Sequence, residues 1–196
     1  KIGDVYSMIV YGLNIEEFEY AYRVDGPYCP EKGLLFDKNN ILLDPYARAV
    51  AGQRTWGIRW DHTYHARVVK DTFDWGDVPQ SKKELCDLII YELHVRDFTH
   101  HPSSGVQHRG TFAGLMEKIP YLKELGINAV ELMPIFEFDE TMNARTVNGT
   151  QLLECWGYNT VSFFAPNSSY SSANEHNREG TELKTLIREL HANGIE

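Results

Sequence analysis

The chain has 196 residues, enough for one large domain or two small ones. Its apolar content of 42% and charged content of 24% are ordinary for a globular protein. The net charge of −9 argues against a nucleic acid partner, because such binding depends on Lys and Arg contacts to phosphates. No apolar run approaches the length of a membrane span, so no membrane partner is expected either. Three widely spaced cysteines suggest neither a disulfide framework nor a zinc site.

Residues 1–50 are predicted to form short β segments separated by turns. The stretches Val5–Tyr11 and Glu17–Tyr22 mix β-branched, aromatic and polar residues, as strands do. Asp25-Gly26-Pro27 predicts a turn between such segments. Too few strands are present to close two sheets, so we expect the last part of a β-sandwich, entered part-way through. Residues 51–82 then read as an aromatic-rich connector whose polar end gives a domain boundary near residue 82.

Residues 83–196 show the pattern of an α/β domain. Leu88–Val95 and Ala129–Met133 are apolar runs typical of strands covered on both faces. Between them we expect a helix that Thr111 caps, that Pro120 kinks or restarts, and that Gly126 ends. This β-α-β order predicts a parallel sheet or a (β/α)8 barrel.

The remainder of the chain is predicted to be one long loop followed by a helix. The polar stretch 136–177 is expected to be a functional or disordered loop. A helix is expected from about Thr181 until Asn193-Gly194, and Ile195-Glu196 would begin a third strand.

Six short motifs resemble the isoamylase-type glycogen and starch debranching enzymes of the α-amylase superfamily. They cover essentially the whole chain in the same order as in that family, which makes the resemblance specific. The motifs are Tyr22–Tyr28, Leu42–Ala47, Tyr91–Phe98, Arg109–Phe112, Glu131–Pro134 and Trp156–Asn159. One departure is Ser169, since relatives commonly carry Arg immediately before the residue that corresponds to Tyr170.

The resemblance implies a multidomain fold: the end of an N-terminal β-sandwich over residues 1–50, the connector 51–82, and the first two β-α units of an incomplete TIM barrel over 83–196. It implies hydrolysis of α-1,6 branch linkages in amylopectin, glycogen or their precursors, with retention of anomeric configuration. In that family an Asp nucleophile and a Glu acid stand on later barrel strands. We therefore expect no catalytic residue here and no hydrolysis by this chain alone, and we predict no cofactor and no metal.

The resemblance also implies a substrate-binding site at Trp156-Gly157-Tyr158-Asn159. Tyr158 is expected to stack under the sugar beside the scissile bond, because aromatic faces suit the apolar C–H surfaces of sugars. For Trp156 packing of the loop is the favoured role, and for Asn159 turn support is favoured over contact with a hydroxyl. Gly157 would let the backbone turn tightly.

Other polar residues follow the two predicted strands. A hydrogen-bonded core role is expected for His94, and a structural ion pair for Arg96 and Asp97. The carboxylates Glu137, Asp139 and Glu140 are expected in a solvated acidic loop, and the pair His100-His101 has no ligand-like partners in the sequence.

Two other functions stay open. The first is a non-catalytic glucan-binding or regulatory subunit that assembles with an active relative. The second is another α-amylase-superfamily enzyme, such as a branching enzyme or a trehalohydrolase. An α-glucan is the expected partner, together with a homo-oligomer or a related isoamylase subunit. The motifs most resemble those of plant or algal starch debranching enzymes, which implies a plastid location. The cytoplasm is the alternative compartment.

Overall fold

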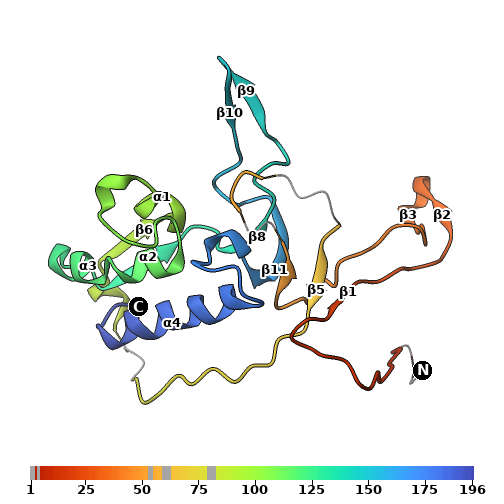
Figure 1. Ribbon diagram of the computed structural model, residues 1–196, viewed down its shortest axis with the longest axis horizontal. Coiled ribbons are helices and arrows are strands. Elements are labelled where there is room, and N and C mark those ends of the chain that lie inside the picture. Colours follow the sequence, from red (N-terminus) through yellow and green to blue (C-terminus); the bar gives the residue numbers. More distant parts are fainter. Residues whose placement is uncertain (1–2, 4, 53–54, 59–62, 79–82) are drawn as a thin grey trace.

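The computed structural model describes residues 3, 5–52, 55–58, 63–78 and 83–196. The predicted domain boundary near residue 82 lies outside the described residues. In chain order the elements are β1 (Glu19–Tyr20), β2 (Tyr28–Cys29), η1 (Pro30–Lys32), β3 (Leu34–Leu35), β4 (Val50–Ala51), β5 (His65–Arg67), η2 (Leu85–Asp87), β6 (Ile90–Leu93), α1 (Val95–His100), η3 (Pro102–Ser104), α2 (Phe112–Met116), α3 (Ile119–Leu125), β7 (Ala129–Leu132), β8 (Phe136–Phe138), β9 (Arg145–Val147), β10 (Thr150–Leu152), β11 (Thr160–Pro166), η4 (Ser168–Tyr170) and α4 (Arg178–Ala192). Figure 1 shows the N-terminal strands on one side and the helical part on the other.

The N-terminal strands are short and antiparallel. β5 lies between β1 and β4, while β2 and β3 form a separate hairpin. The predicted segment Glu17–Tyr22 contains β1, but the predicted strand Val5–Tyr11 is wrong. Its apolar side chains are exposed, with Tyr6 80% and Tyr11 85% accessible. Burial against a neighbouring element therefore does not stabilise a strand there.

The predicted β-α-β unit is confirmed. β6 and β7 pair in parallel, with Ile90 opposite Ala129 and Leu93 opposite Leu132. The intervening helix is split as predicted: α2 ends at Met116, and α3 begins with Pro120 in its first turn.

The caps of these helices also agree with the sequence. The Thr111 hydroxyl accepts a hydrogen bond from the Gly114 N–H at 3.1 Å, and Gly126 ends α3 with φ +86°. The first strand is shorter than predicted, because His94 caps α1 and so ends β6 at Leu93. Nor is β6 covered on both faces in the described structure, since Ile90 is 52% exposed.

The last helix and the start of a third strand follow the prediction closely. α4 begins at Arg178, three residues before the predicted Thr181, and Gly194 follows its end with φ +74°. The Glu196 N–H donates to Asn128 O at 3.0 Å, and the Val130 N–H donates to Glu196 O at 2.7 Å. This is the bonding pattern of a parallel bridge beside β7.

The stretch 136–177 is not the irregular loop that its polarity predicts. β8 pairs with the longer β11, and β9 pairs with β10 in a hairpin that projects away from the molecule (Figure 1). The hairpin turns at Asn148 and Gly149, whose φ angles of +50° and +79° suit a tight two-residue connection. Its polar composition reflects exposure of the hairpin on both faces.

Two apolar clusters hold these elements together. The larger one joins β6, the helices and β8 around the fully buried side chains of Phe112, Phe138 and Tyr170. The smaller one packs Ala47, Val50 and Ala66 of the N-terminal part against Ala165 of β11. Within the described residues, no helix combines the length and the apolar character needed to cross a membrane.

Candidate functional site

The loop that carries the predicted site residues leads into β11 and presents two aromatic side chains to solvent. Tyr158 is 68% exposed and Trp156 is 63% exposed, so neither ring is part of the core. Gly157 between them has φ +81°, and a Cβ there would lie 2.9 Å from the Phe138 ring. Only glycine allows this turn, which confirms the prediction for Gly157.

His94 fixes this loop to the end of β6. Its Nδ1 accepts a hydrogen bond from the Asp97 N–H at 3.1 Å, which assigns the ring proton to Nε2 in the neutral imidazole. Nε2 lies 2.6 Å from the carbonyl oxygen of Cys155 and 3.0 Å from the Tyr170 hydroxyl. The predicted core role of His94 is confirmed, and its bond to Cys155 places Trp156 immediately after a fixed carbonyl.

An aromatic cluster lies beneath the loop. Trp56 stacks on Tyr170 with ring centroids 6.1 Å apart and meets the edge of Phe138 at 5.8 Å. The guanidinium of Arg96 lies 4.5 Å from the centre of the Trp56 ring. Burial lowers the pKa of Arg96, while the nearby carboxylate of Asp97 opposes that change.

The predicted ion pair of Arg96 and Asp97 is not the contact that the structure shows. Arg96 lies over Trp56 and places Nη2 3.3 Å from Nε2 of His100. The carboxylate of Asp97 is mostly exposed and lies 3.7 Å from Nδ1 of His94.

Glu137 and Glu140 correct the prediction of a solvated acidic loop, because both are fully buried. Burial raises the pKa of Glu137 to about 8, and its Oε2 accepts a hydrogen bond from the Ser168 N–H at 2.8 Å. Burial also raises the pKa of Glu140, whose Oε1 accepts from the Gly57 N–H at 2.8 Å. Glu137 of β8 and Glu140 just after it both accept from neighbouring backbone N–H groups, so they hold the loops together.

Asn159 and the residues near Tyr170 support the loop from the other side. The Asn159 amide lies 2.8 Å from the sulfur of Met142. Asn167 accepts from the Ser169 N–H at 2.9 Å and from its hydroxyl at 2.6 Å, so Ser169 has a hydrogen-bond partner in this loop. Among the described residues, no cluster of three or more His, Cys, Asp or Glu side chains could hold a metal ion.

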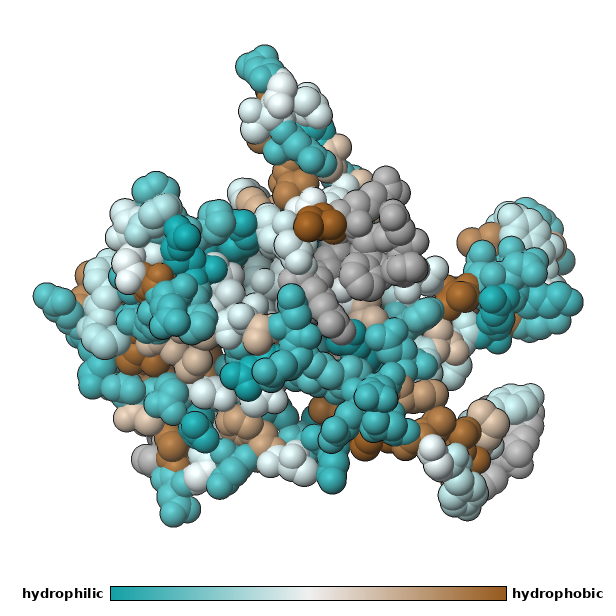
Figure 2. Space-filling view, in the orientation of Figure 1, coloured by the Kyte–Doolittle hydropathy of each residue, from teal (hydrophilic) through white to brown (hydrophobic). Residues whose placement is uncertain are grey.

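Sequence reasoning missed the roles of Trp56 and Tyr170 in this site. Trp56 lies far from Tyr158 in the sequence, whereas Tyr170 follows directly after β11, and no local spacing predicts that the two rings stack. For His94 a signal was present, because a side-chain acceptor followed three residues later by a helical N–H is an N-cap pattern. Figure 2 shows hydrophobic atoms gathered at the base of the projecting hairpin, close to where this loop leaves it.

A family profile described as "Alpha amylase, catalytic domain" matches residues 70–196. The chain belongs to the alpha-amylase family. The parallel strands β6 and β7 and their helices therefore belong to a fold of the TIM-barrel superfamily. The match begins at residue 70, within the stretch predicted to be a connector.

Two curated relatives define the branch of the family. Isoamylase 3, chloroplastic, from Oryza sativa subsp. japonica is 42% identical over 207 residues, which cover 100% of this chain and 26% of the relative. Glycogen debranching enzyme from Serratia proteamaculans (strain 568) is 34% identical over 197 residues, which cover 90% of this chain and 29% of the relative. The predicted resemblance to isoamylase-type debranching enzymes is confirmed. The chain spans about a quarter of the length of these relatives.

A solved structure agrees with the sequence relatives. Pullulanase from Paenibacillus barengoltzii, in complex with maltohexaose and alpha-cyclodextrin, superposes with a TM-score of 0.68 at 26% identity. The superposition covers 91% of this chain and 27% of that chain.

Proposed function

We propose that this chain forms part of the glucan-binding wall of an isoamylase-type enzyme that hydrolyses α-1,6 branch linkages of starch or glycogen. The observation that carries the proposal is the exposed Tyr158 ring on a loop that His94 fixes to the carboxyl end of β6. The carboxyl ends of parallel strands carry the active sites of barrel enzymes. An exposed, rigidly held aromatic face at that end suits the apolar face of a sugar.

Hydrolysis itself is proposed for the polypeptide that carries the later barrel strands. There, one carboxylate attacks the anomeric carbon and a second carboxyl group protonates the leaving oxygen, which retains configuration in two displacements. This chain alone is expected to bind glucan without cleaving it. Trp156 and Asn159 then extend or support the wall beside Tyr158.

The finer features of the fold and setting are part of the same proposal. The antiparallel sheet of β1, β5 and β4 is consistent with the proposal that the end of a β-sandwich precedes the barrel. The chloroplastic relative supports a plastid location and a starch-type glucan as the substrate. The proposed protein partner is a second copy of the chain or a related isoamylase subunit.

Binding of maltohexaose to the chain, measured by isothermal titration calorimetry, tests the assignment of Tyr158. Replacing Tyr158 by Ala should weaken binding roughly fivefold or more, because a stacked aromatic face is lost, while Tyr158→Phe should retain most of the affinity. Tyr28→Ala is the matched control, since Tyr28 is a similarly exposed tyrosine on β2. Equal binding by the Tyr158→Ala and Tyr28→Ala variants would contradict the site.

Release of reducing ends from pullulan tests the reaction. The chain alone should release none, and a longer polypeptide with the later strands should release them. A longer polypeptide that binds glucan without releasing reducing ends would favour the non-catalytic subunit instead.

A further inference from the structure

A second candidate site is a pocket at the C-terminal end of α1. It has a volume of about 610 Å³, and its basic side chains are His100, His101, His108 and Arg109. We call it the basic pocket. Among the described residues that line it, none is Asp or Glu, although the chain as a whole carries a net charge of −9. Three imidazoles and the permanently charged guanidinium of Arg109 are therefore gathered in one hollow.

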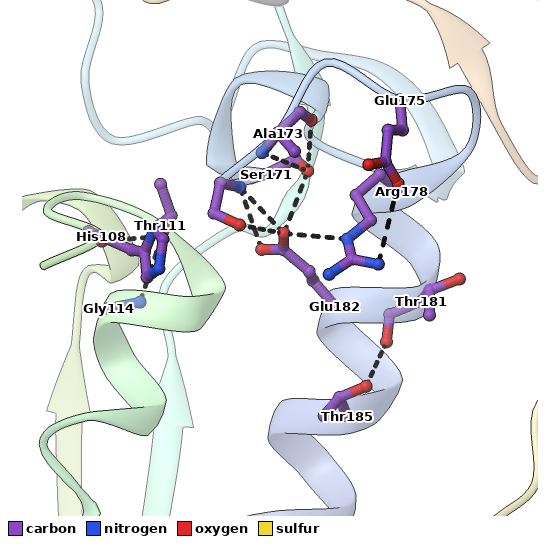
Figure 3. A network of polar contacts seen from close by, with 11 residues as sticks. His108, Thr111, Gly114, Ser171, Ala173, Glu175, Arg178, Thr181, Glu182 and Thr185 are labelled. Carbon is purple, nitrogen blue, oxygen red and sulfur yellow. Dashed lines mark hydrogen bonds and ion pairs between the residues drawn. The ribbon is translucent and has the colours of Figure 1, made fainter.

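The backbone around the basic pocket is firmly held. The Gly110 N–H donates to the Thr99 hydroxyl at 2.8 Å in the interior, and Gly110 turns the chain with φ +76° between Arg109 and Thr111. The Thr111 hydroxyl donates to His108 O at 2.8 Å, so the same turn that caps α2 also positions His108. Figure 3 shows the hydrogen bonds that join His108, Thr111 and Gly114, and beside them the network around Glu182.

The opposite wall comes from Ser172 in that turn. The carboxylate of Glu182 accepts a hydrogen bond from the Ser172 N–H at 3.0 Å and is also bound by the side chain of Arg178 (Figure 3). On the other side, Glu117 accepts from the N–H groups of Gln107 and His108. In the described structure Glu117 and Glu182 thus accept from other donors, and neither is hydrogen-bonded to the Arg109 guanidinium or to the His108 ring.

The key side chains have free donors. Within the part of the chain that the structure describes, neither the Arg109 guanidinium nor the His108 ring makes a hydrogen bond or an ion pair. The pKa of the His100 imidazole is lowered, first by burial and then by the positive charges of Arg96 and Arg109. The charges of Arg96 and Arg109 therefore act at this end of α1, and the same charges would attract a bound anion.

From this geometry we propose that the basic pocket binds a phosphate group, either as free phosphate or as a phosphate monoester on a sugar. Arg109 would donate to two phosphate oxygens at once, and the three imidazoles would supply further N–H donors. A neutral sugar offers no charge to match the Arg109 guanidinium, and among the described residues no group of three or more His, Cys, Asp or Glu side chains could hold a metal ion. The proposal does not depend on the glucan site at Tyr158.

Isothermal titration calorimetry of the chain at low salt tests the proposal with three probes: inorganic phosphate, glucose 6-phosphate and glucose. A phosphate-bearing probe should bind and glucose should not. Arg109→Gln removes the charge with little change in length and should weaken phosphate binding roughly tenfold. His108→Gln should weaken it less. The matched control is Arg145→Gln on the projecting hairpin, which removes the same charge far from the pocket and should leave binding unchanged.

The outcomes separate the two sources of phosphate. Binding of glucose 6-phosphate alone identifies a sugar ester as the ligand, and binding of inorganic phosphate with equal or greater affinity identifies the free ion. The proposal is overturned if neither phosphate binds, if glucose binds as well as its 6-phosphate, or if Arg109→Gln and Arg145→Gln have equal effects. Near-ultraviolet circular dichroism of each variant verifies that the fold is retained, which the exposure of both arginines favours.

Discussion

Glu137 is a fully buried carboxyl group that the fold keeps protonated at neutral pH. Its pKa rises from 4.5 to about 8, mainly because burial disfavours the charged form. In the unfolded chain the group ionises near 4.5, so between pH 4.5 and 8 the native state holds a proton that the unfolded state has released. Native stability therefore falls as pH rises through this window, and the full cost is reached above pH 8.

The variant Glu137→Gln should remove this pH dependence. A neutral amide can still accept from the Ser168 N–H and has no charge to bury, so the variant should gain roughly a few kcal/mol over the wild type at pH 9. At pH 5 the gain should nearly vanish. Chemical denaturation at both pH values measures the difference, with Glu124→Gln on the exposed side of α3 as a control. An equal effect of Glu137→Gln at both pH values would contradict the protonated state.

His94 makes a second prediction at the scale of one residue. The variant His94→Ala leaves the Cys155 carbonyl and the Tyr170 hydroxyl without this partner in the interior, which should cost about 1–3 kcal/mol of stability. Because the Tyr158 loop then loses its attachment to β6, affinity for maltohexaose should fall as well. His108→Ala, an exposed ring without a hydrogen bond, should change neither the melting temperature nor glucan binding.

At the scale of elements, the capping of α2 depends on one side chain. Thr111→Ala removes the hydroxyl that accepts the Gly114 N–H and should reduce stability by about 1 kcal/mol. Thr111→Ser keeps the hydroxyl and should recover most of that loss. Urea denaturation of the three proteins measures the series, and a serine variant as unstable as the alanine variant would show that the cap bond is not the cause.

The elements that the sequence predicts well are those with local signals. Thr111, Pro120 and Gly126 mark where α2 and α3 begin, divide and end, because caps and ring constraints act within one turn of helix. The strands β8 and β11 were missed, because their pairing depends on residues more than 20 positions apart. For the same reason the burial of Glu137 could not be read from its polar neighbours in the sequence, and the site at Tyr158 was predicted only from a family motif.

At the scale of the whole molecule, much apolar surface is uncovered. Phe163 and Phe164 of β11 are 66% and 57% exposed, and Ile89 and Ile90 are more than half exposed. In the described structure β6 also pairs on one edge only, which leaves backbone groups free for another strand. Both features favour contact with further polypeptide.

We therefore expect the isolated chain to self-associate. Light scattering after size-exclusion chromatography should show species larger than a monomer that increase with concentration, and an apolar dye should bind strongly. Ile90→Lys should lower the associated fraction by placing a charge on the exposed strand. A monomer with a sharp, cooperative thermal transition and no dye binding would contradict this expectation.

The close approach of Gly52 to Glu137 has a consequence for how this sequence can change. A Cβ at position 52 would lie 2.6 Å from the Glu137 carboxyl and 2.7 Å from the Ser168 hydroxyl, so a side chain cannot enter while Glu137 keeps its length. The N-terminal part and the barrel part meet at this point, and neither position is free to vary alone. In an evolving population, a substitution of Gly52 should persist only together with a substitution of Glu137 by a shorter residue. The codons for positions 52 and 137 should therefore change together.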